Sequence, residues 1–320
     1  MNTNNYFPAI FLLTVFASCS SSDEEILEND SVRKFRQLNI TQIEGDDATR
    51  SLFDLTRASL IEDIENKKLS ASWTKEDKLT YCNLSDAETL NETIVSISGT
   101  LEAESTSKQS IFSGLTYCTA NDHLALIYPA GFFEYSSIKI KDNYNVYHNT
   151  VKCTLNLSNQ DGTLGKIAKN YYYLYGDVKI VSADNYTASG EVTMVNMLTV
   201  CKFSFVDINN QTSLIPIKKL MIKYNDQNDF LGKYPVTSTL IAYPGYHELR
   251  PNLSDDVLEV ITPTNDNTPT EVYVALLPTD GSEFHFTVVN DLGIYEGTAE
   301  ATLKAGKFVL GPKLKLTKTN

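Results

Sequence analysis

The sequence predicts an all-β fold, and three observations lead to this prediction. Several stretches alternate apolar and polar residues with period two, as half-buried strands do; they include 151–157, 284–288 and 314–316. Turn-forming clusters lie between the strand-like stretches, at Asn121-Asp122, Gln160-Asp161-Gly162, Asn209-Asn210 and Asp280-Gly281. Short strands interrupted this often are typical of β-sandwiches.

One helix and one domain boundary are also expected. The stretch 58–69 has Leu60, Ile61, Ile64 and Leu69 partly at helical spacing, which predicts a short helix there. The length of 320 residues exceeds one typical domain. The polar stretch 182–190 separates two strand-rich halves, so we expect one domain at 35–186 and another at 187–320.

The N-terminus has the pattern of a secretory leader. Its apolar run at 7–17 is shorter than the ~20 residues that a membrane span needs. Cys19 follows small residues directly, as in a bacterial lipoprotein signal, so we expect a signal peptide at 1–18 and acyl chains such as palmitate on Cys19. The segment 1–6 has no Lys or Arg, unlike most leaders. The alternative is a leader that is cut elsewhere, with an incidental cysteine.

The charge of the chain excludes two classes of partner. The formal net charge is −13, and all charged residues follow the leader. Nucleic acid requires stripes of Lys and Arg, and anionic lipid attracts positive charge. We therefore expect no nucleic-acid partner, and we expect attachment to a membrane through acyl chains, with 19–34 as an acidic tether.

Four cysteines follow Cys19, namely Cys82, Cys118, Cys153 and Cys201. An exported protein can form disulfides, and four cysteines allow three full pairings. None has the close spacing of a zinc site. Each lies in an apolar or alternating run, which favours free, buried thiols, with disulfides as the alternative.

The sequence contains no recognisable catalytic or metal-binding motif. The histidines, His123, His148, His247 and His285, lie in different segments without ligand spacing, and the Asp-rich loops lack the glycine and glutamate of a calcium loop. We expect no catalytic residue, metal or cofactor. Consecutive strand residues face opposite ways, so in the tyrosine cluster 171–175 we expect two rings to fill the core and the others to lie at a rim or interface. The alternative is a platform on which sugars stack.

Several stretches carry a resemblance to a known family. In chain order they are Thr49-Arg50-Ser51, Ser72–Leu79 with Trp73 and Asp77, Ile111-Phe112-Ser113-Gly114, Leu126-Ile127-Tyr128-Pro129, Gln160–Leu164 with Ile167 and the tyrosine cluster, and Leu303–Phe308. Together they resemble the fimbrillin family, including the Mfa-like lipoproteins of type V pili, from Thr41 to Asn320. The resemblance implies two tandem transthyretin-like β-sandwich domains after the lipoprotein signal peptide.

The resemblance also implies a mechanism of assembly. In this family a trypsin-like protease cuts after an Arg, the first strand leaves, and an extended strand of another subunit fills the groove. The candidate cleavage site is Arg50, with Arg36 and Arg57 as rivals, and 35–43 is the candidate displaced strand, with apolar Phe35, Leu38, Ile40 and Ile43. The candidate donor is the tail 304–320, which has five lysines and no acidic residue. Its lysines equally suit protection of an edge strand.

Two short features near Cys19 fit the same group of bacteria. Acidic residues after the lipidated cysteine resemble a signal for export to the outer face, with a simple linker as the alternative. Asp30-Ser31-Val32 resembles an O-glycosylation motif, which makes Ser31 a candidate site.

The function expected from this resemblance is that of a fimbrillin-like, surface-exposed lipoprotein of the cell outer membrane and fimbrium. It would be a structural or anchor subunit of a type V pilus, would assemble with other subunits by strand exchange, and would support adhesion to a host or bacterial surface ligand. An anchor subunit would keep its lipid and remain uncut. The alternative is an outer-membrane surface lipoprotein that binds glycans. An exported hydrolase ranks third, because no catalytic site is recognisable.

Overall fold

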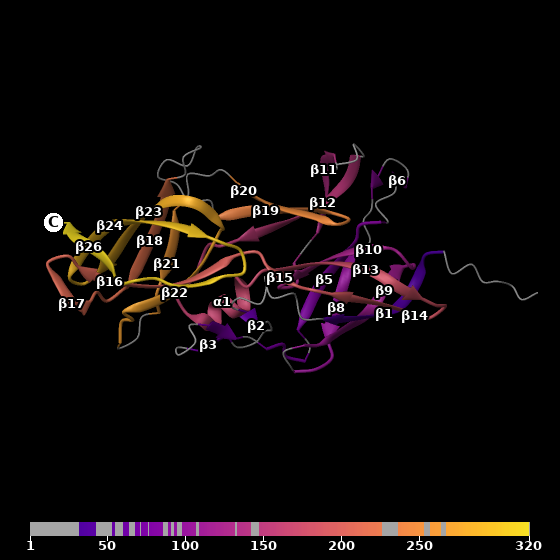
Figure 1. Cartoon of the computed structure of the whole chain (residues 1–320), viewed down its shortest axis with the longest axis horizontal. Coiled ribbons are helices and arrows are strands. Elements are labelled where there is room, and N and C mark those ends of the chain that lie inside the picture. The colour runs from indigo at the N-terminus through magenta and orange to yellow at the C-terminus, as the bar shows by residue number, and fades with distance from the viewer. Residues whose placement is uncertain are drawn as a thin grey trace, which may run out of the picture.

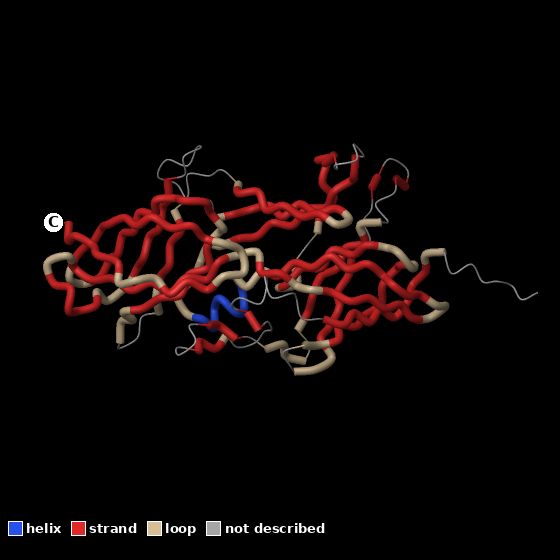
Figure 2. Tube along the Cα trace, viewed as in Figure 1, coloured by secondary structure: helices blue, strands red, loops and turns tan. Residues whose placement is uncertain are grey.

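The structure is a computed structural model, shown in Figure 1, and it consists almost wholly of strands. It describes residues 32–42, 53–54, 60–63, 68–70, 72–75, 77–85, 89–90, 93–94, 98–106, 109–131, 133–141, 147–225, 236–252, 257–263 and 267–319. Figure 2 shows strands along the full length of the molecule and a single short helix among the described residues. The all-β, sandwich-type fold predicted from the sequence is confirmed.

The first sheet contains the early strands of the chain. Its members are β1 (Lys34–Gln42), β5 (Lys78–Asn83), β8 (Ser98–Ala103), β9 (Ile111–Cys118), β10 (His123–Tyr128), β13 (Leu174–Ala183), β14 (Thr187–Val192) and β15 (Val195–Asn196). They run in the order β10-β5-β8-β9-β1-β14-β13-β15, and β10 also pairs with β13. This last pairing joins the first strand of the path to its second-last, so the strands from β10 to β13 form a closed barrel, with β15 attached to β13.

The largest sheet contains the late strands of the chain. Its members are β16 (Thr199–Asp207), β17 (Asn210–Leu214), β18 (Lys219–Asn225), β21 (Leu258–Ile261), β22 (Glu271–Leu276), β23 (Thr279–Asn290), β24 (Gly293–Leu303), β25 (Phe308–Leu310) and β26 (Leu314–Thr319). The main path is β17-β16-β26-β24-β23-β18-β21, with β22 and β25 paired to β16. This sheet and the barrel occupy opposite ends of the long axis in Figure 1.

A third sheet combines strands from both halves of the chain. It has the order β11-β12-β19-β20, with β11 (Glu134–Lys141), β12 (Tyr147–Asn156), β19 (Thr237–Tyr243) and β20 (Tyr246–Pro251). Its apolar side chains, such as Val151, Cys153 and Leu240, pack against Cys82 and Ile127 from the barrel strands β5 and β10. This sheet therefore covers one outer face of the barrel and forms a sandwich with it.

Two small sheets and one helix complete the described fold. The small sheets are β2 (Phe53–Asp54), β3 (Ile61–Asp63) and β4 (Lys68–Ser70), and β6 (Thr89–Leu90) with β7 (Thr93–Ile94). The helix expected at 58–69 is wrong, since β3 and β4 pair there. The helix is α1 (Leu164–Asn170), whose N-cap Thr163 accepts a hydrogen bond from Lys166 N. No helix in the described ranges has the length and hydropathy to cross a bilayer.

The stretch 182–190 contains the turn of a hairpin. Strands β13 and β14 pair across it, and β14 also pairs with β1, so 187–192 belongs to the barrel. The division at 186/187 stays a prediction. The pairing of the sheets favours a division between β15 and β16, because β16 is the first strand of the large sheet.

The core residues fit the sequence predictions for the thiols and tyrosines. Cys82, Cys118, Cys153 and Cys201 are buried, and none of these four forms a disulfide. Tyr171, Tyr172 and Tyr175 are also buried, although 171–173 precede β13 and do not lie in a strand. Three rings of the cluster thus lie in the core, where two were expected, and Tyr173 is partly buried.

Trp73 is the largest fully buried side chain, and its ring contacts Phe112 and Tyr128 edge to face at 4.7 and 5.2 Å. Trp73→Ala would leave a cavity in the barrel, and we expect it to lower the free energy of unfolding by about 3–5 kcal/mol. Urea unfolding followed by circular dichroism would measure this. The control Ile208→Ala removes an exposed side chain and should change stability by less than about 0.5 kcal/mol. Equal effects of the two variants would contradict the burial of Trp73.

Candidate functional site

Strand β1 is the first described strand of the chain, and it lies in the middle of the barrel wall. It pairs antiparallel with β9 from Lys34↔Cys118 to Thr41↔Ile111. On its other side it pairs parallel with β14 from Gln37↔Thr187 to Gln42↔Val192. Since β9 and β14 have no pairing with each other, β1 alone joins them. Removal of β1 would open the barrel at this point.

The inward side of β1 is fully buried. Arg36, Leu38 and Ile40 have no exposed surface, and Gln42 is buried as well. Trp73 Nε1 donates a hydrogen bond of 2.5 Å to Gln42 Oε1. The alternation of period two therefore puts two apolar side chains between an arginine and an amide, and all four point into the core.

The apolar residues of the candidate displaced strand do not all lie on its buried face. Phe35 is 61% exposed, and its ring packs edge to face on that of Tyr117, with 5.3 Å between the ring centroids. Leu38 and Ile40 are even-numbered, so Arg36 and Gln42 share their face and Phe35 does not. Ile43 lies outside the described residues.

Backbone carbonyls surround the guanidinium of Arg36. Its Nε donates to Asp184 O and its Nη1 donates to Cys118 O. Nη1 and Nη2 also reach Val32 O at 3.4 and 3.3 Å. A buried cation needs such acceptors to replace water. The Asp184 carboxylate is exposed, and backbone N–H groups of Thr187 and Tyr186 lower its pKa, with a smaller contribution from Arg36.

Two more cations of the same segment bind at this end of the barrel. Arg33 forms a bidentate pair with Asp122, with distances from 2.9 to 3.1 Å, and its Nη2 donates to Ser85 O at 3.0 Å. Lys34 Nζ donates to Asn185 Oδ1. The acceptors come from three separate turns, which follow β5, β9 and β13. The start of β1 is thus held by charge, and its centre by apolar contacts.

Asp122 has further partners around its buried carboxylate. Oδ2 accepts from Asn83 Nδ2 at 2.9 Å and from Thr119 N at 3.0 Å. The side chain of Asp122 is 4% exposed. Nearby, burial raises the pKa of Cys118 to about 11. Arg36 lowers this pKa and Asp122 raises it, both by less than burial does. The thiol therefore stays protonated at neutral pH.

The candidate donor segment 304–320 is folded into the large sheet, as β25 and β26. Strand β26 pairs parallel with β16 at three positions and antiparallel with β24 at three positions. Its only buried side chain is Leu316. Strand β26 is therefore held by shorter ladders than β1, and β25 adds three pairs with β16 and the buried Phe308.

A cluster that the sequence analysis missed links the segment after residue 50 to the large sheet. Glu62 of β3 accepts from Lys202 Nζ at 3.0 Å and from Tyr273 Oη, and Lys202 also pairs with Glu271 at 3.0 Å. Burial alone lowers the pKa of Lys202, but its hydrogen bonds to the two glutamates raise it well above the ordinary value. The sequence alone could not indicate this cluster, because Glu62, Lys202 and Glu271 lie far apart in the chain and only the fold brings them together.

Several predicted site residues fall outside the described residues. These are Cys19, Ser31, Arg50 and Arg57. Of the three cleavage candidates, only Arg36 is described, and its burial makes it inaccessible to a protease in the folded chain. Arg50 and Arg57 stay predictions.

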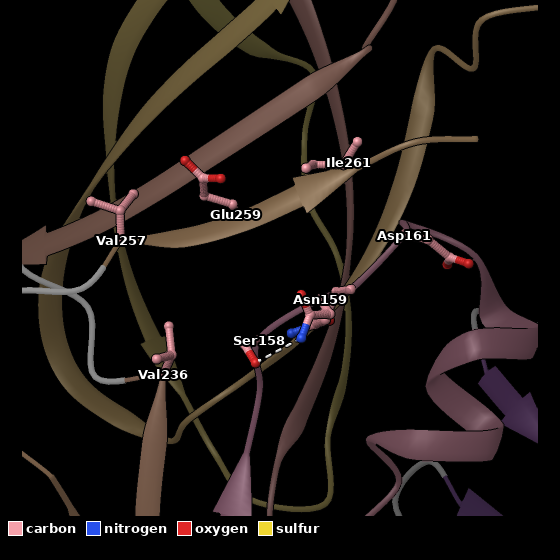
Figure 3. Close-up of a pocket in the computed structure, with 8 residues that line it drawn as sticks. Ser158, Asn159, Asp161, Val236, Val257, Glu259 and Ile261 are labelled. Atoms are coloured by element: carbon pink, nitrogen blue, oxygen red, sulfur yellow. Dashed lines mark hydrogen bonds between the residues drawn. The ribbon is translucent and has the colours of Figure 1, made fainter. Parts of the chain in front are cut away.

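A separate cavity lies beside the large sheet and is shown in Figure 3. It has a volume of about 510 Å³ and is lined by Ser158, Asn159, Gln160, Asp161, Val236, Val257, Glu259 and Ile261. Structural contacts occupy several of its polar groups: Glu259 pairs with Lys219 at 2.6 Å, and Asp161 accepts from Thr163. The Gln160 amide bonds to the backbone of Ala275. None of these lining residues is aromatic, so the cavity offers no ring for a sugar to stack on.

The histidines have separate structural settings. His123 lies 3.1 Å from Asp177, and His285 lies 2.9 Å from Glu283. The His247 ring lies 4.6 Å from that of Tyr175, and burial lowers the pKa of His247 despite the opposing effect of Asp177. No group of potential metal ligands was found among the described residues.

No family model and no curated protein match the chain. Solved structures do. A "putative cell adhesion protein" of Bacteroides ovatus has a TM-score of 0.44 and 12% identity, over 90% of this chain and 97% of the other. A fimbrial protein of the same species has a TM-score of 0.36 and 12% identity, over 89% of this chain and 50% of the other. "Putative polysaccharide binding proteins" of Bacteroides thetaiotaomicron give a TM-score of 0.40 and 9% identity, over 79% and 76%.

The arginine within the barrel can be tested by substitution. Arg36→Met would leave the carbonyls of Cys118 and Asp184 without their donor inside the barrel wall, and we expect a loss of about 2–4 kcal/mol in the free energy of unfolding. Gln37→Met is the matched control, because Gln37 is the exposed neighbour on the same strand. Chemical denaturation of both variants measures the difference. If Arg36→Met were as stable as the control, the carbonyl contacts would not hold β1.

Proposed function

We propose that this chain is a fimbrillin-like, surface-exposed lipoprotein and a structural or anchor subunit of a type V pilus that assembles by β-strand exchange. The observation that carries the proposal is the place of β1, which alone joins β9 to β14 in the barrel wall. A barrel closed by its first described strand becomes an open groove when that strand leaves.

A cut between β1 and the rest of the chain would leave β1 held only by non-covalent contacts. The candidate site Arg50 lies after Gln42, the last residue of β1, and before β2. Loss of β1 would expose the paired edges of β9 and β14 together with the apolar lining of the barrel. Such an edge pairs readily with another strand, because main-chain hydrogen bonds complete the sheet and alternate side chains enter the groove.

The tail 304–320 is the proposed donor strand. Six residue pairs and one buried side chain hold β26 in its own sheet, whereas β1 has longer ladders and four inward side chains. Release of β26 is therefore less costly than release of β1. The lysine-rich tail also has a charge opposite to that of the acidic chain, which favours encounter with another subunit.

Attachment to the cell rests on Cys19. In the proposal, acyl chains on this residue hold the subunit at the outer membrane, and 19–34 spans the distance to β1. A stalk subunit would lose this segment with β1 on cleavage, whereas an anchor subunit would stay uncut and keep it. The adhesive role, towards a host or bacterial surface ligand, belongs to the assembled pilus.

Limited trypsin treatment of the purified chain should start assembly. We expect cleavage after Arg50 and a ladder of multimers that resists SDS, because a completed sheet is lost very slowly. Arg50→Ala should give no ladder, and Arg57→Ala is the control that should still give one. Gel electrophoresis and mass spectrometry of the new N-terminus report both results. Cleaved chains that remain monomers would exclude a stalk role.

Lipidation can be tested in cells by metabolic labelling with a fatty acid. Wild-type protein should carry the label and fractionate with the outer membrane. Cys19→Ala should lose the label and the membrane association, because no acceptor thiol remains. Cys82→Ala is the control that should keep both. A wild-type chain without label would contradict the membrane attachment proposed here.

A further inference from the structure

The end of the barrel that receives the start of β1 is lined by acceptors of hydrogen bonds. We call this site the cation end and define it by the carbonyls of Cys118 and Asp184, the carboxylate of Asp122 and Asn185 Oδ1. In the closed barrel, Arg36, Arg33 and Lys34 occupy these acceptors. The cation end thus binds three positive charges supplied by one strand.

Departure of β1 would remove all three cations at once. Asp122 would keep its bonds from Asn83 and Thr119 but would lose the Arg33 guanidinium. A carboxylate as buried as Asp122 is strongly destabilised without a counter-charge. The carbonyls of Cys118 and Asp184 would lose the donor groups of Arg36. The empty groove therefore favours an occupant with positive charge at this end.

The middle of the groove requires apolar side chains instead of charged ones. Leu38 and Ile40 fill it with apolar side chains at alternate positions, directly after Arg36. A strand that replaces β1 should therefore carry a basic residue, then two apolar residues, with one outward residue between successive members. This pattern is a stricter requirement than general hydrophobicity.

The direction of the incoming strand is not fixed by the backbone. Because β1 is antiparallel to β9 and parallel to β14, those two strands run in opposite directions. A strand placed between them forms one parallel and one antiparallel ladder in either orientation. The pattern of inward side chains then decides the orientation.

The tail of the chain has the required pattern when it is read backwards. Lys318, Leu316 and Leu314 follow one another at alternate positions, as Arg36, Leu38 and Ile40 do. Read forwards from Lys304, the tail has Gly306 in the first apolar position, which would leave the groove unfilled. In the reverse orientation Pro312 falls at the place of Gln42, so the match ends at Leu314.

We propose that the cation end selects the strand that replaces β1, and that this strand is the tail of a second copy of the chain, inserted opposite to the direction of β1 with Lys318 in the place of Arg36. This inference rests on the strand exchange proposed above and adds the determinant of its specificity. Lys315 lies on the other side of the same strand and faces away from the groove.

The test uses the full chain with the recognition sequence of a specific protease in place of residues 46–50, so that its other lysines and arginines stay intact after cleavage. Fluorescent peptides of sequence 310–320 are added, and anisotropy measures their affinity. We expect Lys318→Met to weaken binding on the order of tenfold or more, because a charged hydrogen-bond donor is lost. Lys315→Met is the matched control, with the same change of charge, and should weaken binding less than about twofold.

Each other outcome overturns the inference. Equal losses for the two peptides would mean general attraction to an acidic protein, and no loss for either would mean that the cation end selects nothing. If the wild-type peptide fails to bind while cleaved chains still form SDS-resistant ladders, another segment is the donor and strand exchange stands. If neither peptide binding nor ladders occur, the proposed function fails together with the inference.

Discussion

The structure depends on the closure of the barrel by β1. β1 is the first described strand of the barrel, and both of its neighbours, β9 and β14, come later in the chain. Its ladder to β14 joins residues about 150 positions apart, as the pair Gln37↔Thr187 shows. Contacts of such long range are slow to form, because the entropy of closing the loop is lost before the contacts contribute.

Two kinds of interaction hold β1: apolar contacts in the middle of the strand and charged hydrogen bonds at its start. Leu38 and Ile40 contribute burial of apolar surface, on the order of 1.5–3 kcal/mol each. The start of the strand instead carries Arg33, Lys34 and Arg36 to fixed acceptors. Apolar contacts can form with many strands of similar hydrophobicity. Buried charges are more selective, because a buried charge without a partner strongly destabilises the fold. The charged end therefore fixes the register of β1, because a slip of one residue would put Phe35 among the carbonyls.

The sequence allowed prediction of the fold class and of the strand at 35–43, because alternation and turn residues are local signals. The alternation of period two also indicated which residues share the buried face with Leu38 and Ile40. Arg36 and Gln42 share their parity, but hydropathy alone favoured Phe35, and burial of an arginine depends on carbonyls supplied by distant turns. The helix was expected at 58–69 because of apolar spacing, whereas the chain forms α1 at Leu164–Asn170. The N-cap residue Thr163 was a stronger sequence signal for a helix than the apolar spacing at 58–69.

The two ends of the described chain are arranged alike. Both β1 and β26 lie between one parallel and one antiparallel neighbour, so each fills a gap between strands that run in opposite directions. They differ in how firmly they are held, since β26 buries only Leu316 and has ladders of three pairs on each side. A strand with few native contacts gains more from a deep groove than it loses by leaving its own sheet. In the proposed strand exchange, this difference would set the direction: the weakly held end of one chain would move into the tightly lined groove of another, and the reverse movement would be unfavourable.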